Sequence, residues 1–320
     1  MKIVLVGMTV KPEVTAAYRA VAGAAAVVVE HEAAAIAAMP GADALVVSDN
    51  AYTPGLASAI CAAPNLKWMQ IVTAGYDNIT RLRPPEHAVC TSVGDAFSPS
   101  VAVHAVALML ALQRGIHRMA EHKPRRFWDK ALPSIMVMPE GKTVLIVGYG
   151  SIGRECAKMV APMGMKVIGL TRTGAPDQLA PDLLAETHKI EALHRLLPSA
   201  DAVIVAAPLN PSTVGIIGAA ELALMKRTAF LVNISRGKLV DTSALGAALN
   251  EGRIAGAGLD VTEPEPLPED HPLWDAPNLI VSPHVAGAAG PYGTERQIER
   301  GSANIRRWLG GEPVQNVVRP

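Results

Sequence analysis

Short aliphatic runs alternate with helix-compatible segments along almost all of the 320 residues. Continuous aliphatic runs are typical of strands that are buried on both faces of a parallel sheet. The helices expected at Pro12–Ala22 and Pro54–Ala62 each begin at a proline, which is well tolerated at the first helical position. The alternation therefore predicts an α/β fold with doubly wound parallel sheets. The strands expected in the first part of the chain are Ile3–Val6, Ala26–Val29, Ala44–Val47 and Trp68–Val72.

A second series of strands and helices begins after Pro139 and follows the same alternation. Between the two series, the apolar segment Ser100–Ile116 predicts a buried helix that crosses from a first domain to a second. We expect irregular structure in the basic stretch from His117 to Asp129, and also in Thr262–Pro272, because its prolines fit neither a helix nor a central strand. The strands expected in the second series are Thr143–Val147, Met165–Leu170, Ala202–Ala206, Phe230–Asn233, Ala255–Leu259 and Leu279–Val281, with a helix at Ser151–Met163.

The length of the chain favours two hydrophobic cores over one. Half of the residues are apolar and 18% are charged, so a large buried volume is expected. We predict a flavodoxin-like domain from residues 1–99, completed by residues 285–320, and a second domain from residues 100–284. Because the chain crosses between them twice, a cleft that closes by hinge motion is expected.

The charge balance argues against nucleic acid or an anionic membrane as a partner, since Lys plus Arg equals Asp plus Glu at 29 each. Cys61, Cys90 and Cys156 are widely spaced and form no CxxC pair, so neither a disulfide framework nor a metal site is predicted. The apolar run near the N-terminus is too short for a signal peptide, and no stretch approaches the roughly 20 apolar residues of a membrane span. We expect a soluble, cytoplasmic protein.

A glycine-rich turn follows the strand expected at Thr143–Val147 and opens the next helix, which is the context of a dinucleotide-binding site. Gly148 would allow the tight turn, Gly150 the approach of backbone to a pyrophosphate, and Gly153 the packing of helix on strand. The domain 100–284 is therefore predicted to be a Rossmann-type coenzyme domain. The cofactor contacts predicted in this turn are Gly148, Gly150, Ser151, Ile152 and Gly153.

The end of the second strand of this domain lacks the usual carboxylate for a ribose hydroxyl and has Thr171, Arg172 and Thr173 instead. A guanidinium can pair with a 2′-phosphate, which a carboxylate would repel, and the threonine hydroxyls can donate to it. These three residues predict a preference for NADP over NAD. The alternative is a solvent-facing arginine in an enzyme that accepts either cofactor.

Three residues downstream of the glycine-rich turn carry complementary chemistry: Arg236 in Asn-Ile-Ser-Arg-Gly, Glu265 in Glu-Pro-Glu-Pro-Leu-Pro, and His284 in Ser-Pro-His. Together they suggest hydride transfer to a carbonyl beside a carboxylate. The guanidinium would hold the substrate anion, the imidazolium would supply a proton, and the carboxylate would keep the imidazole charged. His104 lies on the apolar crossing helix and is better explained as a histidine satisfied in the core or between the domains.

Several ordered motifs resemble those of the D-isomer-specific 2-hydroxyacid dehydrogenases, especially the glyoxylate/hydroxypyruvate reductase branch. Their spacing, 29 positions from Arg236 to Glu265 and 19 from there to His284, also matches and favours Glu265 over Glu263 and Glu269. The motifs, apart from those already given, are Thr73-Ala-Gly-Tyr-Asp-Asn-Ile, Ala207-Pro-Leu-Asn-Pro-Ser-Thr, Gly258-Leu-Asp-Val and His271-Pro-Leu-Trp.

The resemblance implies a role for each matching residue. Arg236 would bind the substrate carboxylate and the 2-oxo oxygen, His284 would be the general acid or base, and Glu265 would support its ring. Asp260 would bind the nicotinamide carboxamide. The residues that complete the site are Ala207 and Pro208 for the cofactor and Thr73, Ala74 and Gly75 for the substrate carboxylate, as an anion-binding turn that Gly75 makes possible.

The expected function is thus the reduction of a short 2-oxo acid, such as glyoxylate or hydroxypyruvate, to the D-2-hydroxy acid with NADPH. The resemblance alone implies a homodimer. Two alternatives remain. One is a nucleotide-sensing binding protein like the corepressors that share this fold. The other is a formate or phosphite dehydrogenase, although formate enzymes that resemble this family have glutamine in place of Glu265. Trp274 would either cap an active site or fill the core.

Overall fold

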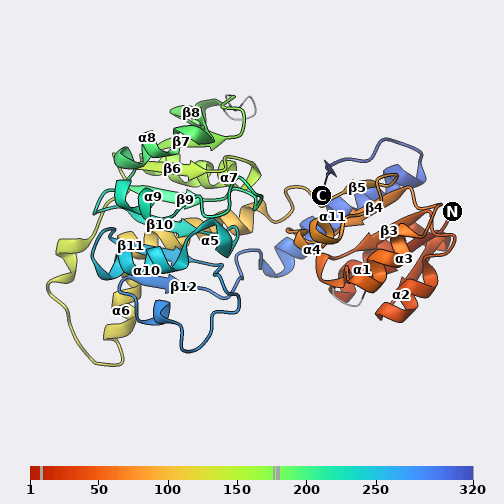
Figure 1. Ribbon diagram of the computed structural model, residues 1–320, viewed down its shortest axis with the longest axis horizontal. Helices are drawn as coiled ribbons and strands as arrows, with labels where there is room; N and C mark the ends of the chain where they lie inside the picture. The colour runs from red at the N-terminus through yellow and green to blue at the C-terminus, as the bar shows by residue number, and fades with distance from the viewer. Residues whose placement is uncertain (8–9, 176, 178–180, 320) are drawn as a thin grey trace. The chain divides into compact units, whose positions relative to one another are not determined.

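The computed structural model describes residues 1–7, 10–175, 177 and 181–319. The chain forms two compact units (Figure 1). Unit 1 comprises Met1–Phe97 and Ala289–Pro320, and unit 2 comprises Ser98–Ala288. Each unit has its own sheet with helices on both faces. The predicted fold class, two α/β domains with parallel sheets, is confirmed.

The sheet of unit 1 has the order β13-β5-β4-β3-β1-β2, and only the pair formed by β13 and β5 is antiparallel. The helices α1 and α11 pack together on one face, and α2 and α3 pack together on the other. The strands are β1 (Ile3–Val6), β2 (Ala26–Val29), β3 (Ala44–Val47), β4 (Trp68–Ile71), β5 (Val89–Thr91) and β13 (Val317–Val318). The helices are α1 (Pro12–Ala22), α2 (Glu32–Ala38), α3 (Pro54–Cys61), α4 (Asp77–Leu82) and α11 (Gly290–Leu309).

The sheet of unit 2 has the order β12-β11-β10-β9-β6-β7-β8, and all of its pairs are parallel. The strands are β6 (Thr143–Val147), β7 (Lys166–Thr171), β8 (Glu186–Lys189), β9 (Ala202–Val205), β10 (Phe230–Asn233), β11 (Gly256–Leu259) and β12 (Leu279–Val281). The α-helices are α5 (Ser98–Gln113), α6 (Ile116–His122), α7 (Ser151–Val160), α8 (Leu193–Leu196), α9 (Ala219–Leu224) and α10 (Thr242–Asn250).

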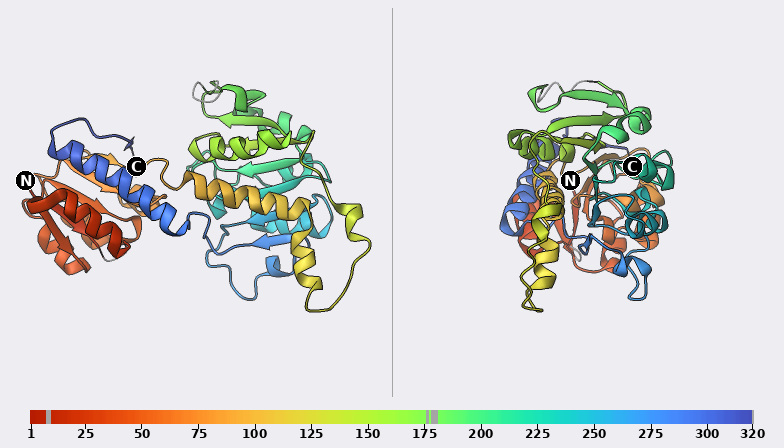
Figure 2. Two further views of the ribbon diagram at one scale, coloured as in Figure 1. Left: turned by 180° about the vertical axis from the view of Figure 1, so that it is seen from behind. Right: turned by 90° about the vertical axis from the view of Figure 1, so that its left-hand side faces the viewer.

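The helix α5 lies directly on the sheet of unit 2, next to α7 and on the face opposite α9 and α10 (Figure 2). Its close approach depends on the two glycines of β11, Gly256 and Gly258. A Cβ atom added to Gly258 would lie 3.0 Å from Leu108 Cβ, and one added to Gly256 would lie 3.2 Å from Leu112 Cδ2. The apolar character of α5 is explained by this burial, except at Val103 and Ala107, which are exposed.

The prediction of irregular structure from His117 to Asp129 is wrong for its first residues, which belong to α6. Gly115 ends α5 with a φ of 64°, and the two helices are bent by 66° at this break. Arg118 anchors α6, because its Nε and Nη2 donate to Asn278 Oδ1 at 2.9 and 2.6 Å. Within the described chain no single helix could cross a membrane, and only the bent pair of α5 and α6 has the length and composition for it.

Candidate functional site

The three chemistry-bearing residues of unit 2 follow neighbouring strands. In the sheet register Asn233 of β10 pairs with Leu259 of β11, which in turn pairs with Val281 of β12. Arg236, Glu265 and His284 therefore belong to three loops at one edge of the sheet, the edge formed by the carboxyl ends of the strands. Ligands of open α/β sheets bind at this edge.

The loop of Arg236 is packed tightly against the next loop. A Cβ atom at Gly237 would lie 1.9 Å from the carbonyl oxygen of Thr262, so only glycine fits there. The Asn233 side chain fixes the turn, because its Nδ2 donates to Arg236 O at 2.9 Å and its Oδ1 accepts from Ser235 N at 3.1 Å. The half-buried Arg236 donates from Nη1 to Ser235 O at 2.6 Å. Local contacts thus position the guanidinium.

His284 and Glu265 are in direct contact, with 2.6 Å between Nδ1 and Oε1. The side chains are 48% and 39% exposed, so both can be reached by a ligand. They line a pocket of about 490 Å³ whose apolar walls include Leu267 and Trp274. Of the alternatives, Glu263 lies beside Lys238 instead, with 3.9 Å between the charged atoms. Trp274 is half exposed and is not a core residue.

Asp260 is buried, with 1% of the residue exposed, and its carboxylate holds the loop of His284. Oδ1 accepts from Ser282 Oγ at 2.6 Å and from Val285 N at 2.9 Å, and Oδ2 accepts from Ala286 N at 2.9 Å. A carboxylate has about four acceptor positions. Three are used by the protein, so at most about one remains for a nicotinamide amide.

The glycine-rich turn has the geometry that a dinucleotide requires. Gly148 has a φ of 93°, and a Cβ atom there would lie 2.4 Å from Ala207 Cα. A Cβ atom at Gly150 would meet nothing within 4 Å, so the backbone at the start of α7 is open to a ligand. One at Gly153 would lie 3.0 Å from Ile146 Cγ2, which shows close packing of α7 on β6. The amides of Ser151 and Ile152 belong to the first turn of α7, and a helix N-terminus of this kind favours anions such as a pyrophosphate.

Hydroxyl groups fix the backbone at Ala207 and Pro208, two further residues predicted to contact the cofactor. Ser235 Oγ donates to Ala207 O, and Thr213 Oγ1 donates to Pro208 O at 2.7 Å. At the end of β7, Thr171 Oγ1 accepts from Gly174 N at 2.8 Å, and among the described residues its hydroxyl proton meets no hydrogen-bond acceptor. In the same turn, Thr173 Oγ1 accepts from Ala175 N at 3.3 Å. Arg172 between them is exposed.

In unit 1 the turn after β4 contains Thr73, Ala74 and Gly75, the residues predicted to bind the substrate carboxylate. Thr73 Oγ1 donates to Gly75 O at 2.8 Å and accepts from Asp49 N at 3.1 Å. Within the described residues, the amides of Ala74 and Gly75 donate to no protein group. The buried carboxylate of Asp49 accepts from the amides of Asn78 and Ile79 at 3.2 and 3.0 Å and so fixes α4 behind the turn.

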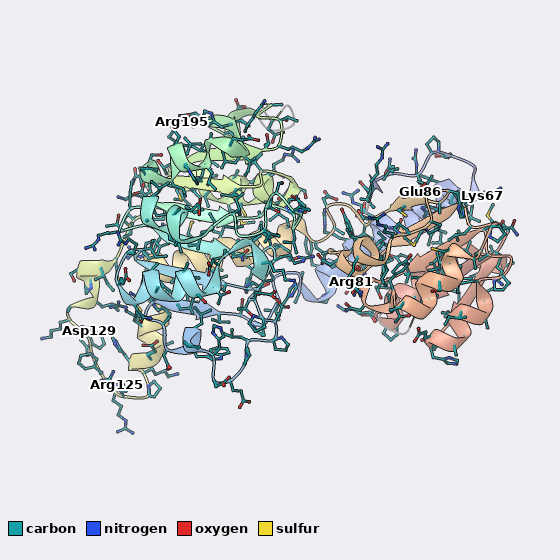
Figure 3. All side chains as sticks on the ribbon, viewed as in Figure 1. Lys67, Arg81, Glu86, Arg125, Asp129 and Arg195 are labelled. Atoms are coloured by element: carbon teal, nitrogen blue, oxygen red, sulfur yellow. The ribbon has the colours of Figure 1, made fainter. Side chains whose placement is uncertain are left out.

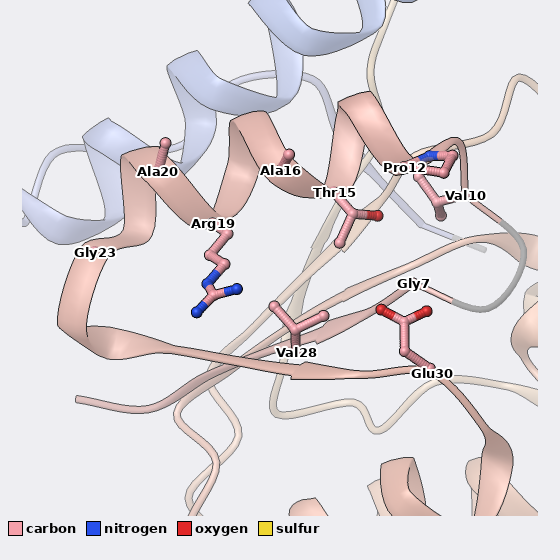
Figure 4. A pocket seen from close by; sticks show the side chains of 10 residues that line it. All are labelled: Gly7, Val10, Pro12, Thr15, Ala16, Arg19, Ala20, Gly23, Val28 and Glu30. Carbon is pink, nitrogen blue, oxygen red and sulfur yellow. The ribbon is translucent and has the colours of Figure 1, made fainter.

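Unit 1 also has a groove of about 730 Å³ between α1 and β2, with Arg19 and Glu30 on its walls (Figure 4). Both side chains are exposed. No residue predicted for the site lines this groove. The chemistry-bearing residues are thus associated with the strand ends and not with this hollow.

Sequence reasoning missed Ser282 and its contact with His104, both in unit 2. The ring of His104 lies 2.7 Å from Ser282 Oγ through Nε2. Ser282 was visible only as part of Ser-Pro-His, where nothing in the sequence distinguishes a structural serine from a functional one.

Comparisons with known proteins extend over both units. Residues 106–286 match the protein family described as "D-isomer specific 2-hydroxyacid dehydrogenase, NAD binding domain". The chain is 35% identical to a glyoxylate reductase of Thermofilum pendens over 262 residues, which are 80% of this chain and 76% of that protein. It is 34% identical to a glycerate dehydrogenase of Methylorubrum extorquens over 275 residues, or 83% and 82% of the two chains. A solved structure of a probable 2-hydroxyacid dehydrogenase from Rhizobium etli, in complex with NADP, HEPES and L(+)-tartaric acid, aligns with a TM-score of 0.82 at 25% identity and covers 100% of this chain and 98% of that one.

Proposed function

Because the chain belongs to the D-isomer specific 2-hydroxyacid dehydrogenases, which are NAD(P)-dependent oxidoreductases, we propose that it reduces a short 2-oxo acid to the D-2-hydroxy acid with NADPH. Glyoxylate and hydroxypyruvate are the proposed substrates, in line with the relatives named glyoxylate reductase and glycerate dehydrogenase. The observation that carries the proposal is the 2.6 Å contact between His284 Nδ1 and Glu265 Oε1. Glu265 follows β11, which is the neighbour of β10, the strand that precedes Arg236. Unit 2 is the proposed dinucleotide-binding domain, and unit 1 the proposed substrate-binding domain.

The proposed mechanism assigns one task to each side chain. Arg236 forms paired hydrogen bonds with the substrate carboxylate and 2-oxo oxygen, which orients the carbonyl. His284 has Nδ1 engaged by Glu265, so Nε2 is the nitrogen that gives its proton to the carbonyl oxygen. The carboxylate of Glu265 accepts from Nδ1 at 2.6 Å and so holds the plane of the ring during transfer.

The cofactor fits the residues of unit 2. When bound, the nicotinamide supplies the hydride that reduces the 2-oxo carbon. The open backbone at Gly150 and the first turn of α7 would hold the pyrophosphate, with Ala207 and Pro208 beside the turn. Asp260 would contribute mainly by holding the loop of His284, with one acceptor position left for the nicotinamide amide.

The direct test is NADPH oxidation by the purified protein with a panel of glyoxylate, hydroxypyruvate, pyruvate and 2-oxobutyrate. We expect the highest kcat/KM for glyoxylate or hydroxypyruvate. Binding of NADPH without turnover of any of these acids would contradict the proposal and favour the nucleotide-sensing alternative.

The cofactor preference makes a separate prediction. Arg172→Ala should lower kcat/KM for NADPH by about 10- to 100-fold, because a charged hydrogen bond to phosphate contributes roughly 1.5–3 kcal/mol. The same change should leave kcat/KM for NADH within about twofold, since NADH has no 2′-phosphate for the guanidinium to bind. Steady-state kinetics with both cofactors checks this, with the exposed Arg195→Ala as the matched control. A tenfold preference of the unmodified protein for NADH would overturn the assignment.

We propose a homodimer that forms through an arm, residues 116–138, which extends from unit 2 (Figure 1). Arg125 and Asp129 mark the arm in Figure 3. The arm exposes several large apolar side chains. A large exposed apolar patch is unusual on a monomer and typical of a surface that associates with another protein. The commonest homo-oligomer is a dimer with two-fold symmetry. Part of the arm surrounds a hollow of about 630 Å³. The large apolar residues exposed on the arm are Ile116, Met119, Phe127, Trp128, Ile135 and Met138.

If the arm forms the dimer interface, a charged substitution on it should halve the molecular mass of the protein in solution. Trp128 is 86% exposed, so Trp128→Glu should leave the fold of the subunit intact and convert the dimer to a monomer. Light scattering after gel filtration measures the mass. Met163→Glu, an exposed apolar residue outside the arm, is the control and should remain dimeric. A monomeric wild type, or a dimeric Trp128→Glu protein, would argue against the arm as the interface.

A cytoplasmic location is also proposed, on the basis of the three free thiols. Burial raises the pKa of Cys90 to about 11 and that of Cys156 to about 12, so both are inert neutral thiols at physiological pH. Cys61 is exposed. An exposed free thiol persists in a reducing compartment. Fractionation of cells that express the protein would test the cytoplasmic location.

A further inference from the structure

The backbone of His284 has a conformation that this residue type rarely adopts. Its φ is 53°, in the left-handed region where the Cβ atom of an L-residue is crowded. Such a conformation persists only where the surroundings hold it. The His284 amide donates to Asp260 O at 2.8 Å, and the next two amides donate to the Asp260 carboxylate, as described above. Asp260 is therefore the group that fixes the turn on which His284 stands.

A buried carboxylate must itself be compensated, because an isolated charge is strongly disfavoured away from water. Ser282 and the amides of Val285 and Ala286 supply most of this compensation, and α5 adds to it. His104 Nε2 lies 2.7 Å from Ser282 Oγ and 3.3 Å from Asp260 Oδ1, and its side chain is 26% exposed. These contacts form a chain of polar groups that runs from α5 through Ser282 to Asp260 and ends at the loop of His284.

The direction of the hydrogen bonds in this chain follows from the number of protons. The Ser282 hydroxyl has one proton, and it is donated to the Asp260 carboxylate, which only accepts. The oxygen of Ser282 must then accept from His104, so Nε2 of His104 carries a proton in this arrangement. Through the same Nε2–H, His104 places positive charge density near Asp260 Oδ1.

We propose that His104 is a positioning residue for the reaction: through Ser282 and Asp260, its Nε2–H holds the loop of His284 in the conformation needed for proton transfer. The inference rests on the proposed role of His284. It assigns a function to a histidine that is otherwise expected to be a satisfied core residue. It also makes α5 a structural support of the catalytic loop as well as of the sheet.

The test compares His104→Phe, which removes the donor, with His104→Gln, which can place an amide N–H near the position of Nε2. His104→Phe should lower kcat by about 10- to 100-fold, the scale seen when an orienting partner or correct placement is lost, and KM for NADPH should stay within about twofold. His104→Gln should recover at least a third of the lost activity on a logarithmic scale. His194→Gln, which breaks the contact of His194 with Glu221 elsewhere in unit 2, is the control and should keep wild-type kcat.

Hydrogen exchange supplies a readout that does not depend on catalysis. The amides of residues 284–286 should exchange faster in His104→Phe and in Ser282→Ala than in the wild type, and not in His194→Gln. Unchanged exchange in both variants would overturn the inference, whatever their activity. If His104→Phe does not fold, Ser282→Ala tests the same chain without altering α5. The activity of His284→Gln is measured in parallel, and full activity of this variant would contradict the proposed function. The exchange rates would then decide by themselves whether His104 holds the loop of His284.

Discussion

His284→Gln is expected to lower kcat for 2-oxo acid reduction at least 100-fold, because proton transfer by a positioned side chain contributes roughly 10²- to 10⁴-fold. Glutamine keeps a polar side chain of similar reach and cannot deliver a proton at neutral pH. The binding of NADPH should be unchanged, since the predicted pyrophosphate site lies at the turn Gly148–Gly153. Steady-state kinetics and fluorescence titration with NADPH measure the two quantities.

The matched change for this prediction is Glu265→Gln, which keeps a hydrogen-bond acceptor beside Nδ1 and removes the negative charge. We expect an intermediate loss in kcat, since the ring stays oriented while the charge-assisted hydrogen bond to it becomes a neutral one. A loss in Glu265→Gln larger than that in His284→Gln would contradict the assignment of His284 as the proton donor. So would a kcat for His284→Gln within threefold of the wild type.

Arg236→Gln is expected to lower kcat/KM by about 10²- to 10⁴-fold, through the loss of two charge-assisted hydrogen bonds of roughly 1.5–3 kcal/mol each. Much of the loss should appear as a higher KM for the 2-oxo acid, because Arg236 also contacts the unreacted substrate. Arg236→Lys should recover only part of it, since an ammonium group lacks the planar fork of the guanidinium. Steady-state kinetics with the preferred 2-oxo acid measures both parameters.

Lys238→Gln is the control for Arg236. Lys238 is a cation two residues away, on the same loop, and its contact is Glu263 at 3.9 Å. Its loss should change kcat/KM by less than about threefold if the geometry of the guanidinium matters more than local positive charge. Equal losses in Lys238→Gln and Arg236→Gln would mean that general charge attraction explains the effect, and a specific pairing with the carboxylate would be wrong.

The strands β1, β3, β9 and β10 could be predicted closely, because each is a short aliphatic run that is buried along its whole length. The short strands β5 and β13 were not predicted. Predictions such as Phe230–Asn233 and Leu279–Val281 agree with the structure at both ends. The edge strand β8, Glu-Thr-His-Lys, was not predicted because it has no aliphatic run. The helix α11 was also not assigned. It contains Gly293 and Gly301, which disfavour a helix in isolation, although Gly301 lets the ring of Tyr18 pack against it.

The candidate site could likewise be predicted only in part. Arg236, Glu265 and His284 could be proposed from residue types and motif spacing, and the register of β10, β11 and β12 gives their loops a common edge. The contacts by which His104 and Ser282 hold the loop of His284 could not be predicted. Ser282 and His104 are 178 positions apart, and their contact exists only because α5 packs on β11. Long-range polar contacts leave no periodic signal in a sequence.

The central claim is tested most directly by the product formed from hydroxypyruvate with NADPH that carries deuterium at both C4 positions. Chiral chromatography with mass spectrometry identifies the enantiomer of glycerate and the label. We predict D-glycerate with one deuterium at C2, formed by the wild type and, at least 100-fold more slowly, by His284→Gln. L-glycerate, unlabelled glycerate, or equal rates for the two proteins would contradict the account.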